Sequence, residues 1–146
     1  PLTELFPYMI VQIIGGISAS ILGNFIAGGT VPIAPGENVP LTAAVLVEFL
    51  FTFALALTVL NVATARGTKN NSFYGLAIGF MVMCGVFAGG GISGGAFNPA
   101  VGIGLSFGAF LGGSGGTWFA LYVVPPIAGG MLAAYVFKMQ GNEDIE

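Results

Sequence analysis

The chain has 146 residues, of which 55% are hydrophobic and only 6% are charged, with a formal net charge of −3. Three basic and six acidic side chains cannot cover the surface of a soluble domain of this size, so the composition indicates a membrane protein. The few cations argue against nucleic-acid binding. A chain with one cysteine and no histidine has no internal disulfide and no metal site or catalytic triad built on these residues. We therefore expect no enzyme, no metal and no cofactor.

Four apolar stretches are long enough to cross the hydrocarbon core of a bilayer, which takes roughly 20 helical residues. They run from about residue 7 to 26, 41 to 65, 73 to 91 and 117 to 139. A shorter apolar segment, from about 98 to 110, is long enough to cross only half a bilayer. The sequence therefore predicts an all-α, multi-pass integral membrane protein, a single domain with four transmembrane helices and one re-entrant half-helix.

The placement of the cations predicts the orientation in the membrane. Arg66 and Lys69 lie between the second and third stretches, and Lys138 ends the fourth. With four spans, these places lie on one face, and the positive-inside rule puts that face and both termini in the cytosol or its equivalent. The acidic tail at residues 140–146 is expected to be disordered.

The strongest local signal is the run GGAFNPAVG at residues 94–102. Asn is a favoured helix N-cap, and Pro suits the first helical position because its missing N–H is not needed there. A helix is therefore expected to begin at Asn98, inside the membrane, where its first N–H groups find no water. Such backbone is tolerated only where it lines a water-filled path or is buried in protein, so the run predicts a pore or a buried site.

This run resembles the second Asn-Pro-Ala (NPA) loop of the aquaporin family, also called the major intrinsic proteins. Further motifs follow in the family's order. Tyr8-x-x-x-Gln12-x-x-Gly15 is similar to the start of the third span, Val47-Glu48-Phe49-x-x-Thr52-Phe53 to the fourth, LAIGF at 76–80 to the fifth, and Trp118 through Pro125 to Gly130 to the sixth. The resemblance implies an aquaporin-like helical bundle that is partial, because the family's first two spans and first NPA loop are not among these residues.

For function, the resemblance implies a passive channel for water or small neutral solutes, set in a lipid bilayer and assembled as a homotetramer in complete family members. In this channel Asn98, Pro99 and Ala100 form the start of the half-helix. The Asn98 amide donates a hydrogen bond to the passing molecule, and the positive end of the helix dipole opposes cations.

The predicted selectivity filter departs from most of the family. Most members carry Arg directly after the second NPA, where this chain has Val101. The alignment gives Val86 at the fifth-span filter position, which is often His, and Gly95 at the loop position. Two Val and a Gly predict a wider and uncharged filter that admits solutes larger than water. Val after the NPA is similar to the plant tonoplast-type subgroup.

Glu48 is a carboxylate inside the second span, where an ionisable group is costly and usually functional or paired. The resemblance implies that it accepts hydrogen bonds from loop N–H groups near the NPA. Thr52, one turn further on, is expected to share that network. A proton relay through Glu48 is the alternative role.

Two other patterns bear on how the helices pack. Small residues recur in three of the spans, at Gly15 to Gly23, Gly75 to Gly85 and Gly129 to Ala134, and this is typical of tightly packed membrane helices. Aromatic residues near the predicted span ends, Trp118 and Tyr122 among them, are expected to form belts at the membrane–water interface.

The alternative function is a non-conducting, aquaporin-derived structural subunit of a larger membrane complex, with other membrane subunits as partners. One half-helix cannot close a two-NPA pore alone, so a channel needs the other half from the same polypeptide or from another chain. A first NPA in the upstream coding sequence favours the channel, whereas a true start near Pro1 favours the structural subunit.

Overall fold

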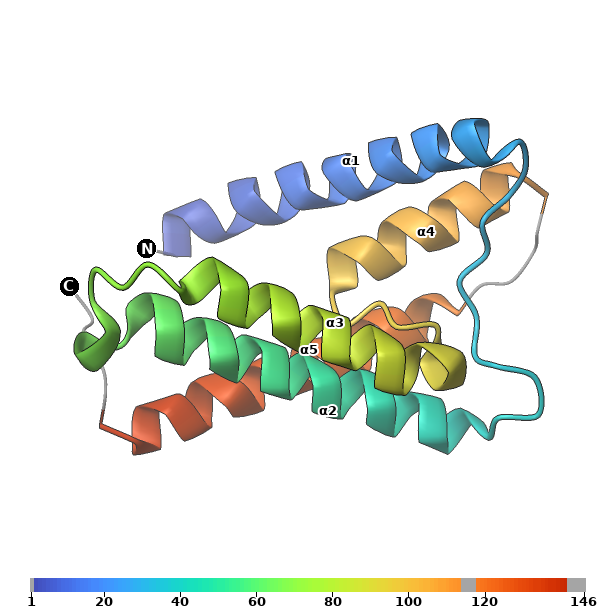
Figure 1. Ribbon diagram of the computed structural model, residues 1–146. Helices are drawn as coiled ribbons and strands as arrows, with labels where there is room; N and C mark the ends of the chain where they lie inside the picture. The colour runs from blue at the N-terminus through green and yellow to red at the C-terminus, as the bar shows by residue number, and fades with distance from the viewer. Residues whose placement is uncertain (1, 114–117, 142–146) are drawn as a thin grey trace.

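The computed structural model describes residues 2–113 and 118–141, which form a bundle of five α-helices (Figure 1). The helices are α1 (Leu2–Ala27), α2 (Leu41–Val59), α3 (Tyr74–Ser93), α4 (Pro99–Leu111) and α5 (Phe119–Met139). A π-helical turn (Leu60–Thr64) and a 3₁₀ turn (Arg66–Thr68) lie between α2 and α3. Four helices are long and apolar enough to cross a membrane, and α4 is a shorter apolar helix. The predicted all-α fold, with four spanning helices and one short helix, is confirmed.

The ends of the helices differ from the expected ranges in a few places. α1 begins at Leu2 and carries Pro7 inside its first turns, where the missing N–H removes only one helical hydrogen bond. α2 continues through the π-helical turn to Thr64. The first residue expected for the last span, the linker residues 114–116 and the acidic tail from 142 onward lie outside the described residues.

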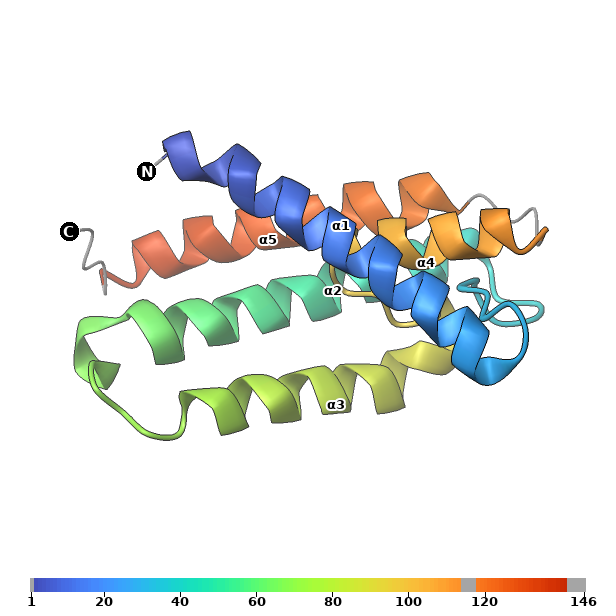
Figure 2. The same cartoon turned by 90° about the horizontal axis from the view of Figure 1, so that it is seen from above.

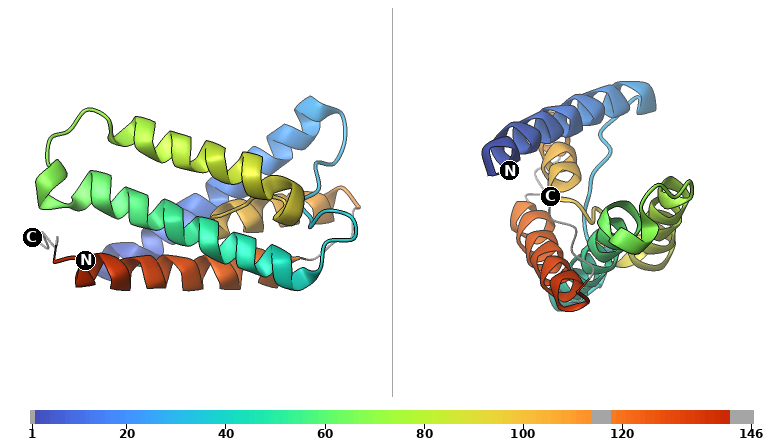
Figure 3. Two further views of the ribbon diagram at one scale, coloured as in Figure 1. Left: turned by 60° about the horizontal axis from the view of Figure 1, so that its bottom comes forward. Right: turned by 90° about the vertical axis from the view of Figure 1, so that its left-hand side faces the viewer.

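The helices form two packed groups that meet at α4. α2 lies between α3 and α5 and packs on both, while α4 packs on α1 and on α5. Within residues 2–113 and 118–141, α4 is the only helix that α1 contacts. Figures 2 and 3 show the result: α4 lies between α1 and α5, and α1 is set apart from α2 and α3.

The short helix α4 begins near the mid-length of the long helices and runs to the end of the bundle where the loop 28–40 lies (Figure 1). The first turn of α1, the connection between α2 and α3 and the last turn of α5 lie at the opposite end. The start of α4, with its motif, therefore lies well away from both ends of the bundle.

Burial is concentrated around the start of α4. The core there consists of small and apolar side chains and one tyrosine: Ile33, Ala44, Ala96, Leu121 and Tyr122. Ile33 comes from the loop 28–40, which is tied to α3 by a hydrogen bond from the Gly36 N–H to the Ile92 carbonyl (3.1 Å).

Elsewhere the long helices expose large apolar side chains, as with Phe87, which is 85% exposed. Apolar surface of this extent suits lipid, and helices satisfy their own backbone hydrogen bonds in hydrocarbon. The protein is a multi-pass integral membrane protein.

Candidate functional site

The site is built around the first turn of α4. Asn98 has extended backbone (φ −155°, ψ 123°), and its side chain accepts a hydrogen bond from the Ala100 N–H, at 2.9 Å from Oδ1. Pro99 occupies the first helical position, and the Gly102 N–H donates to the Asn98 carbonyl (3.0 Å). Asn98 therefore acts as an N-cap, and Pro99 and Ala100 form the first turn.

Two donors of this turn remain unused by the described part of the chain. Oδ1 of Asn98 accepts the capping hydrogen bond, whereas Nδ2 of the same side chain makes no hydrogen bond with residues 2–113 or 118–141. The N–H of Val101 likewise has no protein partner there. The Val101 N–H is one of the first N–H groups of α4, which have no acceptor inside the helix. Both this N–H and the Asn98 amide are therefore available to a molecule at this point.

The loop in front of Asn98 is sharply folded. Gly94, Gly95 and Phe97 all have positive φ, at 95°, 73° and 47°. Positive φ is easy for glycine and uncommon for other residues, so Phe97 needs support from its surroundings. Its ring packs on Phe51 of α2, with ring centroids 5.2 Å apart, and lies against Gly85 of α3, where an added methyl group would come within 2.9 Å of it.

A buried carboxylate holds this loop. Glu48, on α2, is fully buried and accepts hydrogen bonds from the N–H groups of Ala96 (3.0 Å) and Phe97 (2.8 Å), one on each carboxylate oxygen. Hydrogen bonds to a carboxylate are the strong kind, and a buried charge needs them. These contacts are of the kind that the resemblance implies for Glu48, and its role in a pore stays a prediction.

Ser93, which was not among the residues predicted for the site, extends the network. Its hydroxyl donates to Glu48 (2.7 Å) and accepts from the Gly95 N–H (3.1 Å). With the Gly94 N–H bonded to the Gly90 carbonyl (2.9 Å), every N–H from Gly94 to Phe97 has a partner. The N–H groups of the loop are thus all satisfied within the protein. The available signal was a serine directly before two glycines at the end of an apolar helix.

Tyr122 completes the network, and the prediction that it belongs to an interfacial belt is wrong. The side chain is 0% exposed, and its hydroxyl donates to the Ser93 carbonyl. A buried tyrosine needs a hydrogen-bond partner for its hydroxyl, and the last carbonyl of α3 supplies one. The missed signal is Gly102 on α4, whose lack of a side chain makes room for Tyr122, since a methyl group there would lie 2.3 Å from the tyrosine Cβ.

The expectation that Thr52 shares this network is also wrong. Thr52 is buried, and its hydroxyl has no hydrogen-bond partner within the described residues. The physical reason is that Glu48 takes the Ala96 and Phe97 N–H groups with its two carboxylate oxygens, and Ser93 takes the next one. The loop therefore has no N–H left for Thr52 to accept from, and no acceptor among the described residues takes a hydrogen bond from its hydroxyl.

The other flank of α4 lies directly on α1. A methyl group on Gly104 would lie 2.3 Å from the carbonyl carbon of Gly16, and one on Gly108 would lie 1.8 Å from the Ser20 hydroxyl. The backbones touch because these positions lack side chains, as in close helix pairs within membranes. The small residues at Gly16 and Gly129 thus serve packing, whereas Gly15, Gly23, Gly75 and Gly79 face open space.

The C-terminal end of α4 is held by two polar side chains that the sequence analysis also missed. Asn24 Nδ2 donates to the Gly108 carbonyl (3.1 Å), and its Oδ1 accepts from the Val31 N–H (2.9 Å). Thr30 donates to the Gly112 carbonyl (3.2 Å). The Gly108 carbonyl accepts from the Gly112 N–H as well (3.1 Å), so α1 and its following loop add further hydrogen bonds to the last turn of α4.

The residues predicted for the selectivity filter are spread over three elements. Val86, 49% exposed, lies on α3, Gly95 lies in the loop, and Val101, 40% exposed, lies in the first turn of α4. Within the described ranges, α3 and α4 do not pack on each other. These residues therefore form no closed ring in this part of the chain. No cluster of three metal-ligating side chains occurs in the described part of the protein.

The chain is similar in sequence to known proteins over most of its length. The sequence model of the family described as "Major intrinsic protein" matches residues 1–137. The rice (Oryza sativa subsp. japonica) protein named "Probable aquaporin TIP2-2" is 35% identical over 140 residues, which are 94% of this chain and 54% of that protein. "Glycerol uptake facilitator protein-like 6" of Lactiplantibacillus plantarum is 34% identical, over 94% of this chain and 65% of its own length. "Aquaporin AqpM" of Methanothermobacter marburgensis is 30% identical, over 98% and 61%. The chain spans between about half and two thirds of the length of these relatives.

Proposed function

The chain belongs to the major intrinsic protein family, as its motifs predicted, and we propose that it forms one part of a passive channel for water and small neutral solutes. The observation that carries this proposal is the pair of unused donors at the start of α4, the Asn98 amide and the Val101 N–H. Fixed, uncharged donors at mid-membrane depth can donate hydrogen bonds to an oxygen atom of a passing molecule.

The charge distribution supports a neutral cargo. The N-terminus of a helix carries roughly half a positive elementary charge, which is felt strongly where water is scarce. Two uncharged donors next to this field bind the lone pairs of water, urea or an alcohol and oppose cations. Val86, Gly95 and Val101 add no charge, and we propose that they form a wide, apolar filter.

We propose that a second half-helix, from the same polypeptide or another chain, closes the pore. The open faces of α1 and α3 support this, because Gly15 and Gly23 on α1 and Gly75 and Gly79 on α3 have no atom within 4 Å of an added methyl group. Small residues of this kind let another helix approach closely. The length of the relatives, about twice that of the matched part in the rice protein, is consistent with such a half.

The test is a stopped-flow measurement of water and urea permeability, with the full-length protein reconstituted in lipid vesicles. Both permeabilities should exceed those of protein-free vesicles. A Val101→Arg variant should lower urea permeability more than water permeability, because the long cation narrows the filter. Permeabilities equal to those of protein-free vesicles would contradict the channel and favour the structural subunit. Unchanged urea permeability in the Val101→Arg variant would contradict the proposed filter but not the channel.

A further inference from the structure

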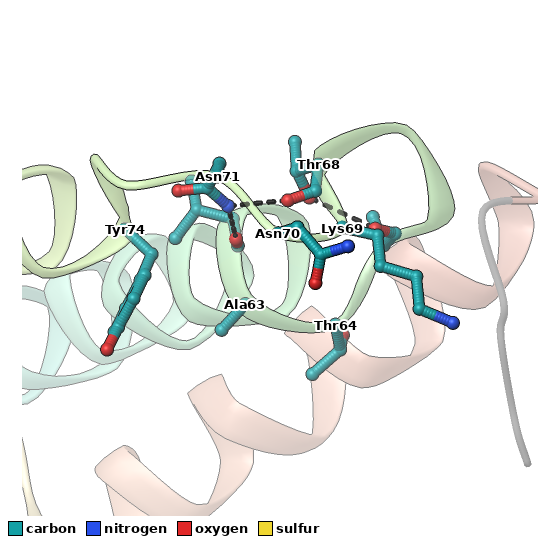
Figure 4. Close-up of a pocket in the computed structure, with 9 residues that line it drawn as sticks. Ala63, Thr64, Thr68, Lys69, Asn70, Asn71 and Tyr74 are labelled. Atoms are coloured by element: carbon teal, nitrogen blue, oxygen red, sulfur yellow. Dashed lines mark hydrogen bonds between the residues drawn. The ribbon is translucent and has the colours of Figure 1, made fainter.

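A cavity of about 410 Å³ lies far from the half-helix, at the end of the bundle where α2 gives way to the connection with α3 (Figure 4). One wall is the π-helical turn with Val62, Ala63 and Thr64, and the opposite wall runs from Thr68 to the first residue of α3, Tyr74. No residue of the NPA loop or of the predicted filter lines this cavity.

Several of the carbonyl acceptors around this cavity are already engaged. The Thr68 hydroxyl donates to the Asn61 carbonyl (2.7 Å), and the Asn71 amide donates to the carbonyls of Val62 and Thr68 (both 2.6 Å). The Thr64 hydroxyl donates to the Leu60 carbonyl (2.6 Å). These bonds take up carbonyls that the end of a helix leaves unpaired, and they brace the connection against the end of α2.

Two side chains with unused donors remain at the cavity, the Lys69 ammonium and the Asn70 amide. Lys69 and Asn70 are exposed, and their side chains make no hydrogen bond or ion pair with the described part of the chain. Asn70 has a left-handed backbone (φ 62°), and Figure 4 shows its amide and the Lys69 chain extending from the connection toward the side where Thr64 lies. The lining includes no acidic residue. Spare donors, a positive charge and the absence of a carboxylate favour an anionic ligand.

The position of the cavity identifies the kind of anion. It lies at the end of the long apolar helices α2 and α3, next to Tyr74, which is 52% exposed. Tyrosine at a span end and cations just beyond it are features of the headgroup region of a membrane. Val62 and Ala63 give the cavity an apolar side.

We propose that this cavity binds the phosphate of an anionic phospholipid, with Lys69 and the Asn70 amide as donors and the acyl chains along α2 and α3. A free phosphate ion would leave the apolar side unused, so the lipid is the preferred source of the phosphate. The binding site is independent of conduction through the proposed pore.

The test is native mass spectrometry of the full-length protein in detergent, titrated separately with phosphatidylglycerol, phosphatidylcholine and inorganic phosphate. Wild-type protein should retain phosphatidylglycerol in preference to the other two. Lys69→Gln should weaken this retention about fivefold, the effect of one lysine near an anionic headgroup, and Lys69→Arg should restore it. Asn70→Gly should weaken it as well, and glycine keeps the left-handed backbone without strain.

The matched control is Lys138→Gln, which removes a cation from the last turn of α5 at the same end of the bundle but not from the cavity lining. It should leave the retention of phosphatidylglycerol unchanged. Equal losses in the Lys69→Gln and Lys138→Gln variants would overturn the proposal in favour of general surface attraction. Equal binding of inorganic phosphate would overturn the assignment to a lipid, and equal retention of phosphatidylcholine would overturn the assignment to an anion.

Discussion

The two ends of α4 are held by different forces. Its N-terminal loop is bound to α2 and α5 through a buried polar network of Glu48, Ser93 and Tyr122. Its flank packs on α1 through direct backbone contact between Gly16 and Gly104. Two side-chain hydrogen bonds hold its C-terminal end. The motif-bearing end thus depends on charge-assisted hydrogen bonds in a dry interior, and the other end depends on close fit.

The largest expected effect is at the polar end. Glu48→Ala leaves the N–H groups of Ala96 and Phe97 buried without partners, at about 1–3 kcal/mol each, so the free energy of unfolding should fall by roughly 2–6 kcal/mol. Glu48→Gln should cost less, because its amide keeps one acceptor oxygen. Denaturation of the full-length protein in detergent measures both, and an alanine variant as stable as wild type would contradict the anchoring role.

The same glutamine variant separates the two roles considered for Glu48. If the carboxylate only supports the loop, Glu48→Gln should leave any pH dependence of solute flux in place. A steep pH dependence that disappears in this variant would support the proton relay instead.

The second expected effect is at the close-fitting flank. Gly104→Ala places a methyl group 2.3 Å from the Gly16 backbone, and overpacking of this kind costs about 1–3 kcal/mol. Gly130→Ala, on α5 with nothing within 4 Å of the added methyl group, is the matched control and should be neutral. If both variants unfold alike, close contact between α1 and α4 is not what holds the half-helix.

A smaller effect is expected from the side chain that joins the end of α4 to α1. Asn24→Ala removes the bonds to the Gly108 carbonyl and from the Val31 N–H, and partly solvated hydrogen bonds contribute about 0.5–1.5 kcal/mol each. We expect faster hydrogen exchange at Val31 and little change at Phe97. Faster exchange at Phe97 as well would show that the two ends of α4 are coupled rather than independent.

The polar end was visible in the sequence for a physical reason. Asn-Pro in an apolar context marks a helix start through local backbone preferences, and a lone carboxylate such as Glu48 inside a span needs a buried partner. The close-fitting end was less visible, because Asn24 and Thr30 bond to residues 84 and 82 positions away. Nothing local distinguishes them from other polar residues of a helix or a loop. Tyr122 was misplaced because α5 is apolar on all sides, so its sequence does not show which face is buried.

The most direct test of the proposed channel asks whether Val101 faces water. In a Cys84→Ser background, which removes the exposed native thiol, Val101→Cys and Met131→Cys variants of the full-length protein in membranes are treated with a charged, membrane-impermeant thiol reagent. Met131 is 70% exposed in mid-helix on α5, against 40% for Val101, so exposure alone predicts faster labelling at position 131. A water-filled path predicts the reverse, with labelling at position 101 and none at 131. Labelling at 131 alone, or at neither position, would contradict the proposal that the start of α4 lines a pore.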